Sequence, residues 1–88
     1  MNEQAELSLP ASVGELRAAI QDELFALREI DANYAKMRDN LTEWTGSEVA
    51  RSRLLQKIEE RQRRDREPHV LRLAELHDRI TSSAISGR

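Results

Sequence analysis

Apolar side chains recur every seven residues through the first half of the chain. One series consists of Val13, Ile20, Leu27, Tyr34 and Leu41. A companion series consists of Leu16, Glu23, Ile30, Met37 and Trp44. Only Glu23 is charged, and the neighbouring Leu24 is expected to cover that step. This spacing is typical of an amphipathic helix with coiled-coil periodicity, so we predict a helix over about 12–43.

Short polar motifs mark the ends of this helix. Ser12 followed by Glu15 matches a capping box, in which a side-chain oxygen accepts a hydrogen bond from a free backbone N–H at a helix start. Gly46 is expected to end the helix by adopting a left-handed conformation. Ser47 or Thr45 is then expected to cap a second helix. A short turn between amphipathic helices makes them antiparallel neighbours.

The second half of the chain alternates between apolar and charged segments. An apolar stripe is expected from Val49, Ala50, Leu54, Leu55 and Ile58, but residues 59–67 contain no apolar side chain. We predict a second helix over about 47–66 whose charged end is exposed. Pro68 is expected to begin a third helix over about 68–81, or else to kink a continuous one. The stripe of that segment consists of Val70, Leu73, Leu76, His77 and Ile80.

These elements predict an all-α fold with one domain over 12–81, between a flexible leader (1–11) and a flexible tail (82–88). If the hairpin pairs Ile58 with Tyr34 or Ile30, the polar stretch 59–67 faces four apolar residues of the first helix, namely Leu16, Ile20, Leu24 and Leu27. Leaving them uncovered forgoes on the order of 6–12 kcal/mol, which is comparable to the stability of a small domain. We therefore expect them to be covered by a second copy in a dimeric bundle, by a partner helix, or by the third helix folded back.

Composition narrows the chemistry that this chain can perform. With no cysteine among 88 residues, disulfides and thiolate metal sites are excluded. His69 and His77 are eight residues apart, with no further ligand at a familiar spacing. We expect no catalytic residue, no cofactor and no metal. No apolar run approaches the roughly 18 residues of a membrane span, and the N-terminus lacks the pattern of a signal peptide, so the cytoplasm is the expected compartment.

Charge is unevenly distributed along the chain. Residues 1–48 carry ten acidic and four basic side chains, whereas residues 49–88 carry six acidic and ten basic ones. The favoured interpretation is attraction between the two arms of the hairpin, because acids interrupt the basic half. The alternative is binding of nucleic acid phosphates by the basic stretch 51–66. Its basic residues are Arg51, Arg53, Lys57, Arg61, Arg63, Arg64 and Arg66.

The tripeptide Trp44-Thr45-Gly46 lies at the middle of the chain, between two long amphipathic helices. In this respect the chain resembles the WXG helical-hairpin family of type VII secretion, a likeness that implies a dimerising hairpin with Trp-x-Gly at its turn. The family's tyrosine-plus-acid export signal is not found after the second helix. The string 27–34 (Leu-Arg-Glu-Ile-Asp-Ala-Asn-Tyr) is similar to the N-terminal coiled coil of the inhibitor-of-growth family, which implies a dimeric docking helix.

The less favoured alternative is a helical enzyme. The string 15–20 (Glu-Leu-Arg-Ala-Ala-Ile) and the string 65–67 (Asp-Arg-Glu) resemble segments of the all-helical chorismate mutases. An active site of that kind needs cationic side chains aimed at two carboxylates. At the matching spacing after Arg17 this chain has Tyr34 and Thr45, so we predict no enzymatic activity.

The sequence therefore predicts a protein–protein interaction module, such as a small adaptor, chaperone-like protein or structural subunit. Its partner is expected to be a second copy or another protein. The residues predicted to contact that partner are Leu16, Ile20, Leu24, Leu27, Trp44, Val70, Leu73, Leu76 and Ile80.

Overall fold

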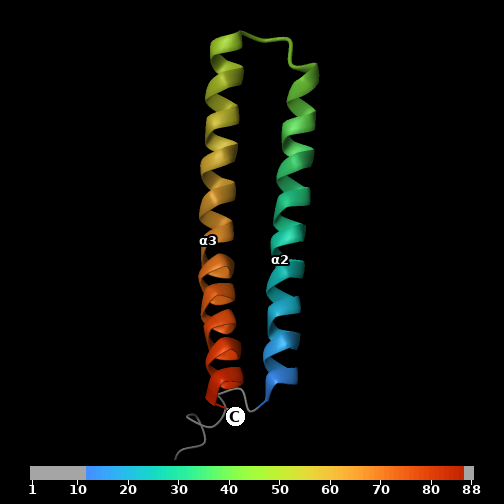
Figure 1. Ribbon diagram of the computed structural model, residues 1–88. Coiled ribbons are helices and arrows are strands. Elements are labelled where there is room, and N and C mark those ends of the chain that lie inside the picture. The colour runs from blue at the N-terminus through green and yellow to red at the C-terminus, as the bar shows by residue number, and fades with distance from the viewer. Residues whose placement is uncertain (1–11, 87–88) are drawn as a thin grey trace, which may run out of the picture.

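A computed structural model shows an antiparallel pair of long helices (Figure 1). Helix α2 spans Val13–Asn40, the 3₁₀ turn η1 spans Leu41–Glu43, and helix α3 spans Glu48–Ser86. The structure describes the backbone of residues 12–86 and the side chains of residues 12–83. No strand occurs within that range. The all-α helical hairpin predicted from the sequence is confirmed, while the predicted leader 1–11 lies outside the described residues.

Both helices begin at a serine, as the capping signals predicted. The Ser12 hydroxyl accepts a hydrogen bond from the Glu15 N–H at 3.1 Å. The Ser47 hydroxyl accepts one from the Ala50 N–H at 3.1 Å. Each bond satisfies a backbone donor that has no partner inside its own helix. These two caps set where α2 and α3 begin.

The first helix ends differently from the prediction. Neither Gly14 nor Gly46 has a positive φ, so a left-handed Gly46 is wrong. The chain instead tightens into η1, and the Trp44 N–H bonds to the Leu41 carbonyl at 3.2 Å. Trp44 itself is extended, with φ −64° and ψ 127°. This extended residue, rather than glycine, takes the chain out of the helical conformation.

The favoured interpretation of Pro68, a separate third helix, is wrong, whereas the alternative of a continuous helix is confirmed, because α3 continues through Pro68 to Ser86. Proline removes one helical hydrogen bond and usually kinks or ends a helix. Here the segments on both sides of Pro68 are tied to α2, through Arg66 bonded to Asp31 and His69 bonded to Glu23. These contacts favour a helical backbone across the proline, and the helix extends five residues beyond the predicted end at 81.

The pairing of the two helices is shifted relative to the prediction. Tyr34 meets Asp65 rather than Ile58. The reason lies at the turn, where η1 and the extended residues after it lead the chain past the end of α2 before α3 begins (Figure 1). The charged stretch 59–67 therefore lies beside the last third of α2. The apolar residues after Pro68 lie beside its first half.

This shift changes which leucines are covered. Leu16 and Leu27 are 4% and 7% exposed, so the expectation that they face charged residues is wrong. Ile20 is half-buried, and Leu24 remains 39% exposed. The molecule measures 60 × 29 × 15 Å, so it is one helix layer thick. Such a layer buries the inner stripe of each helix and leaves the outer flanks open.

Candidate interaction surface

The buried interior of the hairpin is small. The hydrophobic side chains classed as buried among the described residues are Leu16, Leu27, Tyr34 and Leu76. Three of them are aliphatic, and the fourth is a tyrosine with a polar tip. A helix pair of this length therefore owes part of its cohesion to polar contacts between α2 and α3.

Asp31 is the centre of one set of those contacts. It accepts hydrogen bonds from Arg66 and, at 2.8 Å, from the Gln62 amide. The Gln62 oxygen in turn accepts one from Arg38 at 2.8 Å. The hydrogen bond from Arg66, followed by that from Gln62, lowers the pKa of the Asp31 carboxyl from its ordinary value. Because charge-assisted bonds are directional, this set fixes the level at which α2 and α3 pair.

Tyr34 adds a neighbouring contact between the helices. Its hydroxyl donates to Asp65 Oδ2 at 2.5 Å. This hydrogen bond to a carboxylate raises the pKa of the Tyr34 hydroxyl. The polar tip of a buried aromatic residue is thereby satisfied, so the tyrosine in the heptad series is an interior residue of the hairpin.

Glu23, the only charged member of the heptad series, joins the first half of α2 to α3. Its carboxylate meets His69 Nδ1 at 2.6 Å and accepts a hydrogen bond from Arg72 at 3.1 Å. The hydrogen bond with His69 is the main cause that lowers the pKa of Glu23, with Arg72 assisting against desolvation. The sequence pattern indicates that Glu23 interrupts the apolar stripe, whereas in the structure its carboxylate joins α2 to α3.

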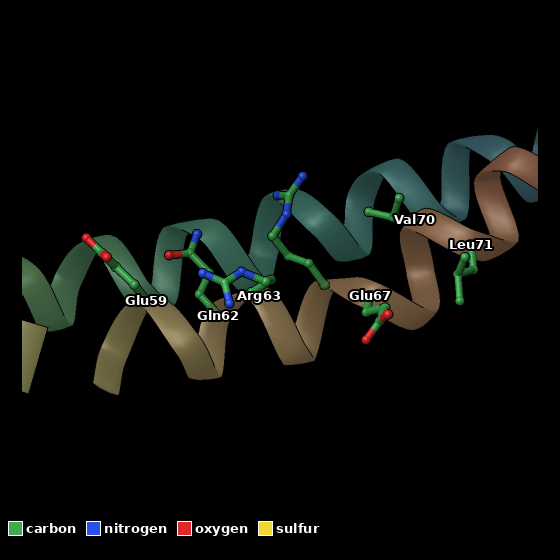
Figure 2. A pocket seen from close by; sticks show the side chains of 7 residues that line it. Glu59, Gln62, Arg63, Glu67, Val70 and Leu71 are labelled. Atoms are coloured by element: carbon green, nitrogen blue, oxygen red, sulfur yellow. The ribbon is translucent and has the colours of Figure 1, made fainter. Parts of the chain in front are cut away.

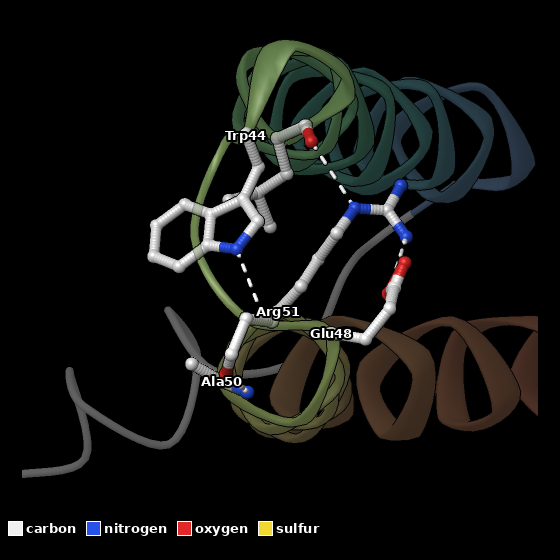
Figure 3. Close-up of polar contacts among 6 residues, drawn as sticks. Trp44, Glu48, Ala50 and Arg51 are labelled. Atoms are coloured by element: carbon white, nitrogen blue, oxygen red, sulfur yellow. Dashed lines mark hydrogen bonds and ion pairs between the residues drawn. The ribbon is translucent and has the colours of Figure 1, made fainter.

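The turn is braced by Trp44 and Arg51 (Figure 3). The indole Nε1–H donates to the Ser47 carbonyl at 3.0 Å. Arg51 Nε donates to the Leu41 carbonyl at 3.2 Å. A Cβ placed on Gly46 would lie 2.7 Å from the indole ring. Any larger residue at this position would therefore require the indole ring to shift, because the tryptophan packs against the glycine backbone.

The residues predicted to contact a partner divide into three groups. Leu16, Leu27 and Leu76 are buried between α2 and α3, where no partner reaches them in the closed hairpin. Ile20, Leu73 and Ile80 are half-buried at the edge of that interior. Leu24, Trp44 and Val70 are exposed. Only the members of the third group have more than about a third of their surface exposed.

Further exposed apolar residues escaped the sequence prediction. They are Val13, Phe25, Met37, Val49, Leu54 and Leu71. Val13 and Met37 belong to the heptad series, and their exposure follows from the shifted pairing. Phe25 and Leu71 are 61% and 62% exposed. Their only signal in the sequence is an apolar residue outside the stripe.

The basic residues of 51–66 also divide. Arg51 and Arg66 are occupied by contacts within the hairpin. The other five are exposed. Four of these share one face of α3 because they recur at three- and four-residue steps: Arg53, Lys57, Arg61 and Arg64.

Possible metal ligands do not gather within the described residues. His69 is engaged with Glu23, and His77 is exposed. No group of three or more His, Asp or Glu side chains in residues 12–83 is arranged to hold a metal ion. Likewise, neither described helix has an apolar stretch long enough to cross a membrane.

An open groove of about 610 Å³ follows one flank of α3 (Figure 2). Its lining consists of Glu59, Gln62, Arg63, Arg66, Glu67, Val70 and Leu71. The groove is charged toward the turn and apolar at the Val70 end. Grooves between adjacent rows of side chains receive the ridges of another helix.

Comparison of the chain with known protein families, with curated proteins and with solved structures finds no match to any of them.

Proposed function

We propose that this protein is a non-enzymatic interaction module that recognises helices through the outer flanks of its hairpin. The observation that carries the proposal is the exposure of large apolar side chains along a molecule one helix thick. Leu24 and Val70, predicted from the sequence as contact residues, are among them. The partner is a second copy of the chain or another amphipathic helix.

The energetics support this proposal. Helical domains pack at least two layers around a common core, because each helix must bury an apolar stripe. Burying one large aliphatic side chain contributes about 1.5–3 kcal/mol. With four hydrophobic side chains fully buried in the described hairpin, covering a few exposed ones would add a contribution comparable to that of these four.

The polar residues support the same proposal. The closest contacts of Glu23, Asp31, Asp65 and His69 join α2 to α3. These side chains hold the hairpin in one alignment. They act as a scaffold that presents the outer flanks in a fixed geometry.

Analytical ultracentrifugation combined with thermal unfolding over a range of protein concentrations tests the proposal. We expect the purified chain either to associate, with a melting temperature that rises with concentration, or to unfold without cooperativity until a partner helix is supplied. A cooperatively folded monomer at micromolar concentration, with a melting temperature independent of concentration, would overturn the proposal.

A second candidate function rests on the exposed basic face formed by Arg53, Lys57, Arg61 and Arg64. This face would bind nucleic acid phosphates. Each phosphate neutralised on duplex DNA contributes about 0.9 to the slope of log affinity against log salt. Changing all four residues to glutamine should then reduce both affinity and slope, whereas changing Arg17, Arg28 and Lys36 on α2 should leave them nearly unchanged. Equal losses in the two variants would contradict a site on α3.

A further inference from the structure

Resting on the proposed function, we propose that the helices covering the open flank belong to a second copy of this chain. The two hairpins lie flank to flank, with both turns at the same end. Leu24 of each copy packs on Val70 of the other. The result is a two-fold dimer with two layers of helices.

The contacts within one hairpin place Leu24 and Val70 on the same flank. Glu23 pairs with His69 across the helix interface. Leu24 follows Glu23, and Val70 follows His69, so both lie at the level of that pair. In antiparallel helices, one step toward the C-terminus turns each side chain toward the same flank. The two side chains are 39% and 44% exposed.

A stripe of side chains follows this flank on each helix at three- and four-residue steps. On α2 the stripe consists of Leu24, Arg28, Asp31 and Ala35; on α3, of Val70, Glu67, Arg63 and Glu59. All four residues of the α3 stripe line the groove, and Figure 2 labels them among its lining residues. Within residues 12–83, Arg28, Arg63 and Glu67 form no ion pair.

The two stripes complement each other level by level. Leu24 matches Val70, Arg28 matches Glu67, Asp31 matches Arg63, and the small Ala35 lies opposite Glu59. A two-fold axis parallel to the helices keeps every residue at its own level and places α2 of one copy on α3 of the other. Each match then occurs twice, as a self-complementary interface requires. A ridge of α2 also enters the groove on α3.

An axis perpendicular to the helices gives a different arrangement. It puts the turns at opposite ends and brings α2 onto α2 of the second copy. If that axis crosses α2 between Arg28 and Asp31, Arg28 faces Asp31 and Leu24 faces Ala35. If it crosses at the level of Leu24 and Val70, each of these residues faces its own copy, but Arg28, Arg63 and Glu67 face no opposite charge. The first arrangement buries Leu24 against Val70 and also gives these charged residues opposite charges, and for that reason we favour it.

Disulfide trapping between two variant chains tests the arrangement. The sequence has no cysteine, so each introduced thiol is the only one in its chain. Purified L24C and V70C chains, mixed in equal amounts and oxidised, should yield the mixed disulfide well above its random share. The matched control mixes D22C with E75C, which are exposed on the same two helices but lie outside both the stripes and the groove. We expect only the random share from this control.

A charge exchange gives a second readout. R28E alone and E67R alone each place two like-charged pairs in the dimer, and we expect each to weaken association by about tenfold. Mixing the two variants restores both opposite-charge pairs, so a heterodimer of near wild-type affinity should form. D31R mixed with R28E tests the alternative axis. Because Asp31 also accepts hydrogen bonds from Arg66 and Gln62 within the hairpin, circular dichroism checks first that D31R keeps its helicity.

The outcomes separate this inference from the proposed function. Rescue by D31R with R28E, or a random share of the L24C–V70C disulfide from a chain that still associates, would overturn the arrangement but leave helix recognition intact. If the L24C–V70C disulfide forms only at its random share and the chain folds only when a different protein is added, the partner is not a second copy of this chain. A stable monomer would overturn both proposals.

Discussion

Glu23 shows how one charged residue in an apolar series sets the alignment of the hairpin. A carboxylate between two helices is expensive to desolvate unless it is paired. His69 and Arg72 provide that pairing from α3. An apolar residue at this position would pack against the neighbouring helix at more than one level, whereas the carboxylate accepts only the level that brings its two partners into reach.

The pH dependence of stability should report this cluster. The pKa of Glu23 is lowered from its ordinary value of 4.5, chiefly by the hydrogen bond with His69. Its contribution to stability is therefore present above pH 4.5 and is lost as pH falls through the lower, folded-state pKa. We expect E23Q to have a smaller difference in the free energy of unfolding between neutral and acidic pH than the wild type. Urea denaturation across this pH range measures the difference.

Glu60 provides the control for this experiment. It is an exposed carboxylate on α3 that forms no hydrogen bond or ion pair with the described residues of α2, so E60Q should keep the wild-type pH profile. A profile of E23Q that coincides with that of the wild type would show that the carboxylate does not stabilise the hairpin. E23Q should still lose some stability at acidic pH, because the pKa of Asp31 is also lowered.

At the scale of elements, the turn depends on a contact between Trp44 and Gly46. A Cβ at Gly46 would lie 2.7 Å from the indole ring, so the ring must move in G46A. We expect a loss of about 1–3 kcal/mol in the free energy of unfolding, as for other overpacked sites. Because Trp44 is the only tryptophan, a change in its fluorescence emission should accompany the loss.

Gly14 is the matched control, since it lies inside α2 and an added Cβ would only reach the Ser12 hydroxyl at 3.7 Å. Replacing a helical glycine by alanine reduces the freedom of the unfolded chain. G14A should therefore stabilise the hairpin by about 0.5–1 kcal/mol. A destabilising effect of the same size at both glycines would contradict a specific role for the Trp44–Gly46 contact.

Replacement of Pro68 is expected to stabilise the hairpin, in contrast to replacement of Gly46, because α3 is continuous around the proline. Proline inside a helix is about 3 kcal/mol less favourable than alanine, through the lost hydrogen bond and the clash with the preceding turn. P68A should therefore raise the free energy of unfolding by about 1–3 kcal/mol while far-UV circular dichroism shows equal or greater helicity. A destabilised P68A would indicate that the hairpin requires the backbone shape imposed by proline.

The two helices and the turn also show which features of the fold can be predicted from the sequence. Local signals predicted the helix class, the position of the turn and the serine caps, because period and capping act over a few residues. The sequence left two interpretations of Pro68 open and favoured a new helix, because contacts of Arg66 and His69 with a distant helix, which outweigh the local preference of proline, are not visible in the sequence. Leu16, Leu27 and Leu76 were assigned to a partner interface, because their burial depends on the level at which α2 meets α3. Leu24 and Val70 remain predictions of a contact surface.

For the whole molecule, one layer of two helices creates two kinds of leucine. Leu27 is 7% exposed and belongs to the interior of each hairpin, whereas Leu24 is 39% exposed on its flank. We expect L27A to lower the melting temperature at every protein concentration, because the cavity left by the leucine lowers the free energy of unfolding by about 2–5 kcal/mol. L24A should instead flatten the rise of melting temperature with concentration, because it weakens association. Calorimetry over a wide concentration range distinguishes the two effects. Parallel curves for L24A and L27A would mean that both leucines serve the hairpin interior and that the flank is not a contact surface.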